Sequence, residues 1–332
     1  MQFKETAITS RERLDYKTTY IIELWEDENP EVKGVGEISL FESLSKEAGP
    51  GFETRLNETV RAINENGRVE DVLAAVEESS ILFGIETAAA SLKSHGGYEL
   101  WPSEFTRGER PVPINGLVWM GDYRQMRTRI AKKLEEGFRC IKLKIGGIDF
   151  KDEVALLKMI RRDYNRDNLE LRLDANGAFT PLNALERLTI LSKYDIHSIE
   201  QPIKAGQLDE MRRISEESPI AIALDEELIG TRSSNEKIGL IEAIKPSYIV
   251  LKPSLAGGFA HTEEWISIAK EHGIGWWITS ALESNIGLNA LAQYVALHNP
   301  TMPQGLGTGE LYVENFPTPL VRKGENLWYG VV

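Results

Sequence analysis

The chain has 332 residues, of which 42% are hydrophobic and 27% charged, and its formal net charge at pH 7 is −13. This composition is typical of a globular protein, and the length suffices for a barrel with an added domain. The acidic balance excludes a broadly basic surface, so we expect neither nucleic acid nor an anionic membrane surface as a partner.

The sequence lacks the features of a secreted or membrane protein. No apolar run reaches the ~18 residues of a membrane span, and the first residues lack the apolar core of a signal peptide. The single cysteine, Cys140, excludes an internal disulfide and fits a reducing compartment. We therefore expect a cytoplasmic protein, and the sequence leaves its oligomeric state open.

Residues 1–110 show the pattern of an α+β unit. Residues 16–25 alternate in the manner of a strand, and residues 34–38 form the expected returning strand after a polar hairpin loop. Helical patterns follow at 53–66, 68–80 and 81–92. Because these elements precede any strand–helix alternation, we expect a capping domain over residues 1–110, completed by the C-terminal tail 311–332.

From Pro111 onward, strand and helix patterns alternate. The expected strands begin near Ile114, Ile141, Leu171, Ser198, Ala221, Tyr248 and Trp276, and the expected helices span 122–136, 150–164, 181–194, 207–217, 235–243, 261–272 and 285–298. Residues 304–306 are a candidate eighth strand. The alternation predicts an α/β fold with a modified TIM barrel, (β/α)7β, over residues 111–310. No GxGxxG turn follows a strand, which disfavours an open dinucleotide-binding sheet.

Five of the expected strands end on a charged side chain. The segments are 141–144, 171–174, 198–200, 223–225 and 249–252, and their charged ends are spaced by 25–30 residues, about one βα unit. In a parallel barrel the carboxyl ends of all strands open on one face. Two lysines, Lys144 and Lys252, would therefore meet three carboxylates at one mouth.

The three carboxylates, Asp174, Glu200 and Asp225, would repel one another if they converged without a cation. A hard divalent cation removes that repulsion, and oxygen ligands suit Mg²⁺, with Mn²⁺ as the alternative. Zinc is disfavoured because neither Cys140 nor a histidine cluster joins the set. Each acid alone is typical of a surface residue, but three at successive strand ends indicate a metal site.

The two lysines would face each other across a bound substrate, since their strands lie on opposite sides of the barrel. A nearby cation or second lysine lowers the pKa of an ammonium, so the neutral amine can act as a base. The arrangement predicts removal of a proton α to a carboxylate, on a small anionic substrate, followed by elimination or reprotonation. Lys142 shares the strand face of Lys144; the alternative is that either lysine only extends its charge at the barrel rim.

Further polar residues follow the same strand ends. Asn176 and Glu226 are expected to orient the metal ligands or the lysines. Candidates for substrate binding near the last two strands are Ser280, Glu283, Gly307 and Thr308. The first two would equally suit a cap of the next helix, and the glycine-rich residues 305–309 would suit an anion cradle or a plain turn.

The motifs Lys-x-Lys, Asp-x-Asn, Glu-Gln-Pro, Asp-Glu and Lys-Pro, in this order, resemble those of the enolase superfamily over residues 18–311. The resemblance implies an α+β capping domain over a (β/α)7β barrel. It also implies that Asp174, Glu200 and Asp225 bind Mg²⁺, that Lys144 is the base and that Lys252 is the opposing lysine. Loss of a lysine or a metal ligand would mark an inactive barrel, and none is lost here.

Within the superfamily, residues 114–121, 280–287 and 305–309 resemble the o-succinylbenzoate synthase family of the muconate-lactonizing-like subgroup. That resemblance implies syn-dehydration of 2-succinyl-6-hydroxy-2,4-cyclohexadiene-1-carboxylate in menaquinone biosynthesis, with residues 10–11 and 36–39 closing over the substrate. The alternatives are an N-acylamino-acid racemase and a dipeptide epimerase. Dipeptide epimerases commonly carry Asp-x-Asp after the last strand, and residues 305–309 contain no acid.

Overall fold

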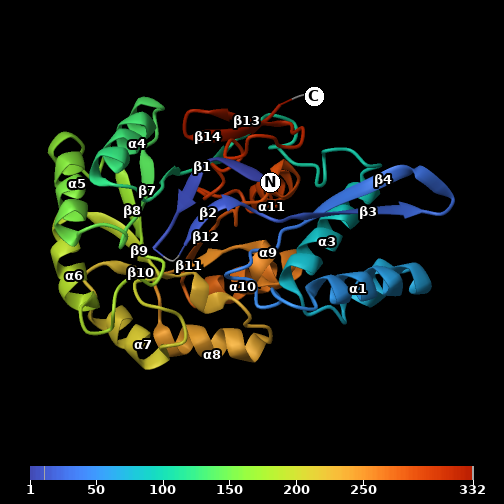
Figure 1. The fold of residues 1–332 in the computed structure, drawn as a ribbon, viewed down its shortest axis with the longest axis horizontal. Helices are drawn as coiled ribbons and strands as arrows, with labels where there is room; N and C mark the ends of the chain where they lie inside the picture. Colours follow the sequence, from blue (N-terminus) through green and yellow to red (C-terminus); the bar gives the residue numbers. More distant parts are fainter. Residues whose placement is uncertain (11, 331–332) are drawn as a thin grey trace.

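The computed structural model of the chain describes residues 1–10 and 12–330. Its centre is a curled parallel sheet of seven strands in the order β12-β11-β10-β9-β8-β7-β6 (Figure 1). The strands are Gly116–Val118 (β6), Cys140–Lys144 (β7), Glu170–Asp174 (β8), Ile196–Glu200 (β9), Ala221–Leu224 (β10), Tyr248–Leu251 (β11) and Gly275–Ile278 (β12). The seven strands expected from the sequence are present, and each pairs in parallel with its neighbour in the sheet.

The candidate eighth strand joins the two edges of this sheet. Gln304 bridges Ile114 before β6, and Gly305 bridges Thr279 after β12, both in parallel. The backbone N–H of Asn115 donates to the Gln304 carbonyl at 2.9 Å, and that of Gly305 donates to Ile278 at 2.8 Å. The sheet therefore curls and meets at this short segment, which confirms the predicted barrel-like fold.

Helices connect the strands. They are α4 (Tyr123–Glu135), α5 (Phe150–Asp163), α6 (Ala184–Leu191), α7 (Leu208–Glu217), α8 (Ser234–Ile244), α9 (Pro253–Ala256), α10 (Gly258–Glu271) and α11 (Asn285–Ala296). Helix α4 begins where expected, because Asp122 and Gln125 form a capping box. The prediction that a helix begins at Pro181 was wrong: the Thr180 N–H donates to the Asn183 side chain at 2.9 Å, and this turn delays the helix.

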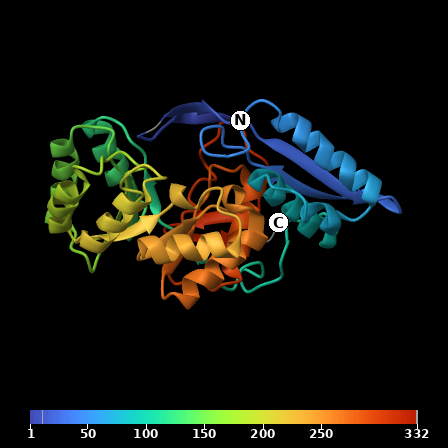
Figure 2. The ribbon, with the colours of Figure 1, turned by 90° about the horizontal axis from the view of Figure 1, so that it is seen from below.

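Strands β1–β4 and helices α1–α3 form a separate group, which we call the cap. Their bounds are Gln2–Ile8 (β1), Arg13–Tyr16 (β2), Tyr20–Glu26 (β3), Asn29–Ile38 (β4), Phe52–Asn66 (α1), Val69–Leu73 (α2) and Ser79–Lys93 (α3). Figures 1 and 2 both place most of these blue and cyan elements at one end of the molecule, with α3 beside α9 and α10.

Three expectations for the cap need correction. Residues 16–25 form parts of two strands, because the chain leaves β2 at Lys17 and turns that side chain inward. The hairpin loop is shorter than predicted, since Glu26 already pairs with Asn29. The helix expected at 68–80 ends at Leu73, and the following residues reverse the chain so that α3 can pack against β4.

Two glycines allow β4 to cross α3 at backbone contact distance. A Cβ atom at Gly36 would lie 2.0 Å from the Gly84 carbonyl oxygen, and one at Gly84 would lie 2.3 Å from the Ile38 side chain. Neither position has room for a larger residue. The close crossing buries Ile38, Ile81 and Ile85 in an apolar core of the cap.

The C-terminal tail pairs with two parts of the molecule. Residues 311–313 lie beside β1, where Lys4 donates to the Leu311 carbonyl and Val313 donates to Gln2. The hairpin of β13 (Leu320–Lys323) and β14 (Asn326–Tyr329) extends the two-residue strand β5 (Val112–Pro113). The domain division at Pro111 stays a prediction. Among the described helices, none is both long and apolar enough to cross a bilayer.

Candidate active site

The strand ends bring the predicted charged residues together. Lys144 pairs in register with Asp174, and Asp174 with Glu200. Asp225 and Lys252 directly follow the ends of β10 and β11, the next strands in the sheet. All five side chains therefore lie at one end of the sheet, as the spacing of the motifs predicted.

Buried ion pairs connect the lysines to the carboxylates. Lys142 Nζ donates to Asp174 Oδ2 at 3.0 Å and to Glu200 Oε2 at 2.8 Å. Lys144 Nζ donates to the same Asp174 oxygen at 2.6 Å, and Lys252 Nζ donates to Asp225. Because Asp174 serves two lysines at once, the first two strand ends form a single charged cluster.

The three lysines differ in proton affinity. Burial lowers the pKa of Lys144, and attraction to Asp174 only partly offsets that effect. Burial acts in the same direction on Lys142 and Lys252, but the neighbouring carboxylates outweigh it, so both of these pKa values are raised. Lys144 is therefore the lysine best suited to act as a neutral base, and Lys252 is suited to remain charged.

One of the three carboxylates, Glu200, has a raised pKa and an oxygen without a hydrogen bond among the described residues. Burial and the negative charge of Asp174 raise the pKa of Glu200 well above its usual range, and the buried Oε1 atom of Glu200 receives no hydrogen bond within the described residues. In the part of the chain that the structure describes, no group of three or more His, Cys, Asp or Glu is already arranged around a metal position. Lysine ammonium groups contact the Asp174 and Asp225 oxygens there. Three hard oxygen donors, one of them unsatisfied, nevertheless suit a hard divalent cation.

Asn176 connects the base to a further carboxylate. Its Oδ1 atom accepts from Lys144 Nζ at 2.8 Å, and its Nδ2 atom donates to Glu226 Oε1 at 3.0 Å. Its backbone has a φ of 45°, a left-handed conformation that asparagine tolerates better than most residues. The sequence assigned no role to Gln201, yet its side-chain oxygen accepts from the Asp225 backbone N–H at 3.2 Å.

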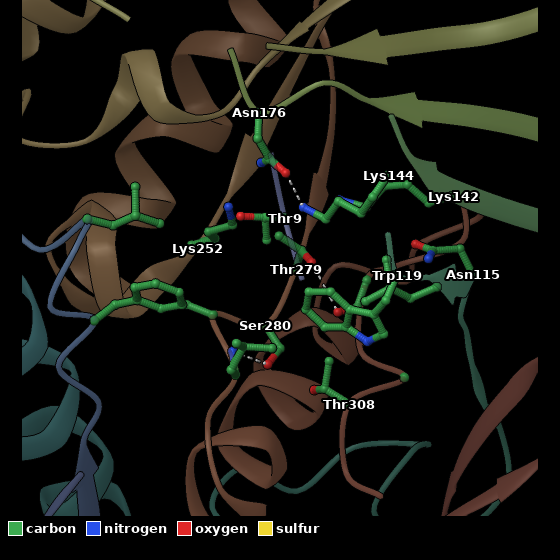
Figure 3. Close-up of a pocket in the computed structure, with 17 residues that line it drawn as sticks. Thr9, Asn115, Trp119, Lys142, Lys144, Asn176, Lys252, Thr279, Ser280 and Thr308 are labelled. Carbon is green, nitrogen blue, oxygen red and sulfur yellow. Dashed lines mark hydrogen bonds between the residues drawn. The ribbon is translucent and has the colours of Figure 1, made fainter. Parts of the chain in front are cut away.

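A cavity lies beside these groups, and Lys142, Lys144, Lys252 and Asn176 line it. In Figure 3, Lys144 and Lys252 enter the cavity from opposite sides, below Asn176. A bound substrate would therefore have one lysine on each side.

Three of the four candidate substrate-binding residues line the cavity, and the fourth does not. Ser280, Gly307 and Thr308 line the cavity. Glu283 does not: it is fully buried, and its two oxygens accept from Ser254 Oγ and Ser280 Oγ, each at 2.6 Å. Its position therefore does not support the predicted substrate contact.

Sequence reasoning gave no site role to several residues that line the cavity. Thr9, Phe41, Leu44, Asn115, Leu117, Trp119, Thr279, Ala281 and Leu282 belong to this set. A usable signal existed for three of them, because residues 115, 117 and 119 alternate along the strand expected from Ile114 and would so share a face.

The contribution of the cap to this cavity differs from the expectation. Ser10 Oγ donates to the Ala175 carbonyl at 2.9 Å and so contacts the mouth, whereas Arg11 lies outside the described residues. Residues 36–39 do not line the cavity; Phe41 and Leu44, a few residues later, do. The backbone amides of Ser284 and Gly287 hold Glu37 instead.

Comparisons with known proteins agree with this geometry. The model of the family described as enolase C-terminal domain-like matches residues 125–324. Over 97% of its length, the chain is 44% identical to an o-succinylbenzoate synthase of Desulfotalea psychrophila and covers 95% of that protein. The chain belongs to the o-succinylbenzoate synthase family. The family resemblance stated from the motifs is thereby confirmed.

Solved structures extend the comparison. The crystal structure of MenC from Desulfotalea psychrophila LSv54 matches with a TM-score of 0.81 and 42% identity, covering 98% of this chain and 97% of that one. The L-Ala-D/L-Glu epimerase from Bacillus subtilis matches with a TM-score of 0.84 over 99% of this chain and 93% of that one, at 17% identity. The second match shows a shared fold alone.

Proposed function

We propose that the chain catalyses the dehydration of 2-succinyl-6-hydroxy-2,4-cyclohexadiene-1-carboxylate to 2-succinylbenzoate, a step of menaquinone biosynthesis in the cytoplasm. The observation that carries this proposal is the pair Lys144 and Lys252 on opposite sides of one cavity (Figure 3), each bonded to a buried carboxylate. The near full-length similarity to an o-succinylbenzoate synthase supports the choice of reaction within the superfamily.

For the metal, we propose that Asp174, Glu200 and Asp225 hold Mg²⁺, with Mn²⁺ as the alternative. When bound, the cation supplies positive charge that offsets the negative charge developing on the substrate carboxylate. The unsatisfied oxygen of Glu200 and its raised pKa support this assignment, because a cation at that position relieves both.

Lys144 acts as the base in this proposal. Its lowered pKa favours the neutral amine, which takes the proton from the carbon that bears the carboxylate. The electron pair of that C–H bond moves into the ring as the C–O bond to the hydroxyl breaks. The newly charged Lys144 returns a proton to the departing hydroxyl on the same face, so water leaves and the ring becomes aromatic.

Lys252 and Lys142 act electrostatically. Lys252 keeps its charge and stabilises the developing negative charge from the opposite side of the cavity, where it also lies suitably for attraction to the forming aromatic ring. Lys142 bridges Asp174 and Glu200 and holds these two carboxylates together. Asn176 orients Lys144 through its hydrogen bond, and Glu226 fixes Asn176.

A second candidate follows from the same lysine pair. Two lysines on opposite faces of an α-carbon also permit racemisation, in which one removes the proton and the other returns it. An N-acylamino-acid racemase would use this arrangement without a binding site for a substrate ammonium group.

Two substrates distinguish these activities. Purified protein with Mg²⁺ should consume the cyclohexadiene substrate and release one equivalent of 2-succinylbenzoate. A folded protein that leaves the diene intact but exchanges the α-proton of N-acylamino acids in D₂O would replace the dehydration proposal with racemisation.

A further inference from the structure

Three buried charged residues connect the cap to one wall of the cavity, and the proposed reaction uses none of them. Glu37 lies in β4, Lys17 lies between β2 and β3, and Glu283 follows β12. The exposed fractions are 0% for both glutamates and 7% for Lys17. Charged side chains are rarely buried to this degree unless they are paired, so the three require a joint explanation.

Glu37 reaches from the cap to the start of helix α11. Its oxygens accept from the backbone N–H groups of Ser284 and Gly287, each at 2.9 Å, and from the Ser284 hydroxyl at 2.5 Å. Thr19 also donates to it, at 2.8 Å. A carboxylate is stabilised at a helix N-terminus by the unpaired amides and the helix dipole, so this contact ties β4 to α11.

Lys17 lies near this contact between Glu37 and the start of α11. Its Nζ atom donates to the Leu282 carbonyl at 3.0 Å and to Ser39 Oγ. Burial lowers the pKa of Lys17, while the negative charges of Glu283 and Glu37 act in the opposite direction. The Lys17 ammonium group therefore feels the charge of one carboxylate from the barrel, Glu283, and of one from the cap, Glu37.

Leu282, whose carbonyl Lys17 holds, has an unusual backbone. Its φ is 63°, in the left-handed region that non-glycine residues other than asparagine and aspartate seldom adopt. The same carbonyl accepts a second hydrogen bond, from Tyr312 Oη at 2.5 Å. Two donors from opposite ends of the chain thus hold one strained peptide in place.

The strained peptide belongs to the wall of the cavity. Residues 280–282 line it, and Leu282 packs there with Phe41 of the cap. The Leu282 N–H donates to Ser280 Oγ at 3.0 Å, and that hydroxyl donates its proton to Glu283 at 2.6 Å. Ser280 therefore has no proton left for the substrate, and the wall acts through its shape.

We propose that Lys17 is a positioning residue for the active site: by donating to the Leu282 carbonyl from the cap, it fixes the wall formed by residues 280–282. The identity of the substrate that packs on this wall rests on the proposed function; the contact between Lys17 and the wall does not. Lys17 is distant in the chain from the metal-ligand candidates and contacts none of them in the hydrogen bonds that the structure shows.

The test compares Lys17→Met, which keeps most of the length of the side chain but removes its charge, with Lys33→Met. Lys33 is an exposed lysine paired with Glu23 in the cap. Loss of a hydrogen bond from a charged donor predicts a KM for the diene raised roughly tenfold or more in Lys17→Met, with kcat changed by less than about threefold. Lys33→Met should leave both constants unchanged.

A second variant and a substrate-free measurement keep the test decisive. Tyr312→Phe removes the other donor to Leu282 and should raise KM in the same direction even if Lys17→Met does not fold. Hydrogen exchange of the Leu282 amide should be at least about tenfold faster in Lys17→Met than in wild type.

Unchanged KM and unchanged exchange in a folded Lys17→Met protein would overturn the inference, as would a loss of thermal stability alone. If the wild-type protein does not consume the diene, the proposed function fails, and the exchange measurement still decides whether Lys17 holds the wall.

Discussion

Replacing Lys144 with methionine should remove catalysis while leaving the fold intact. Methionine fills most of the same volume but has no amine, so the α-proton of the substrate loses its base. The neighbouring Lys142 still contacts both Asp174 and Glu200, and therefore the carboxylate cluster keeps an ammonium partner.

The expected magnitudes separate activity from stability. A positioned general base contributes about 10²–10⁴-fold in rate, which corresponds to ~2.7–5.5 kcal/mol of barrier. For stability, the variant loses two buried hydrogen bonds of Lys144, of 2.6 Å to Asp174 and 2.8 Å to Asn176. A hydrogen bond from the neutral amine that the mechanism requires is worth about 1 kcal/mol, so the loss of both should cost about 2 kcal/mol.

The assay follows the ultraviolet absorbance of the diene at saturating substrate and metal, with Lys158→Met as the control. Lys158 is exposed on α5 and should be replaceable without effect on rate or stability. We expect Lys144→Met to retain less than about 1% of wild-type kcat and to unfold within about 2 kcal/mol of wild type. A folded variant that keeps more than about a tenth of wild-type kcat would refute the base assignment.

Other predictions concern metal binding, packing and thiol chemistry. Mg²⁺ at 100 times its dissociation constant should stabilise the wild type by about 2.7 kcal/mol in thermal unfolding. Glu200→Gln should lose most of that gain, and an equal gain in the wild type and the variant would contradict the assignment of Glu200 as a metal ligand. Gly36→Ala should destabilise the protein by about 3 kcal/mol or more, because its Cβ would meet the Gly84 carbonyl. The control is Gly239→Ala, in an exposed part of α8 where a Cβ meets no other atom; it should be neutral or stabilising by up to about 1 kcal/mol. Similar denaturation midpoints for Gly36→Ala and Gly239→Ala would refute the packing argument. Burial raises the pKa of the Cys140 thiol far above its usual value, so the thiol stays protonated at pH 8 and should react with a thiol reagent only after unfolding; stoichiometric labelling of the native protein would contradict this.

The local sequence pattern predicted much of the fold and the charged residues at the centre of the site. Five of the seven barrel strands end on, or directly before, a charged residue, and parallel pairing then brings these ends together whatever the helices do between them. Lys144, Asp174 and Glu200 were therefore predictable from their spacing alone. Asn176 was also predictable, since it lies two residues beyond Asp174.

The residues that the sequence missed depend on contacts between distant segments. Lys17 looks like an ordinary strand residue, and Glu37 was expected only as part of the segment that closes over the substrate. The contacts that bury both side chains join the cap to residues 282–284 of the barrel. Glu283 lies three residues beyond Ser280 and looked equally suited to substrate binding. Its side chain is instead buried against the Ser254 and Ser280 hydroxyls, and it follows Leu282, whose left-handed backbone the sequence gives no reason to expect.

The most direct test of the central claim measures turnover of the cyclohexadiene substrate by the wild-type protein before and after metal removal. Mg²⁺ should support fast loss of the diene, EDTA should abolish that activity, and Mg²⁺ added back in excess should restore it. Turnover that persists after complete removal of divalent cations would contradict the role assigned to Asp174, Glu200 and Asp225. No turnover by a folded, metal-bound protein would contradict the dehydration itself.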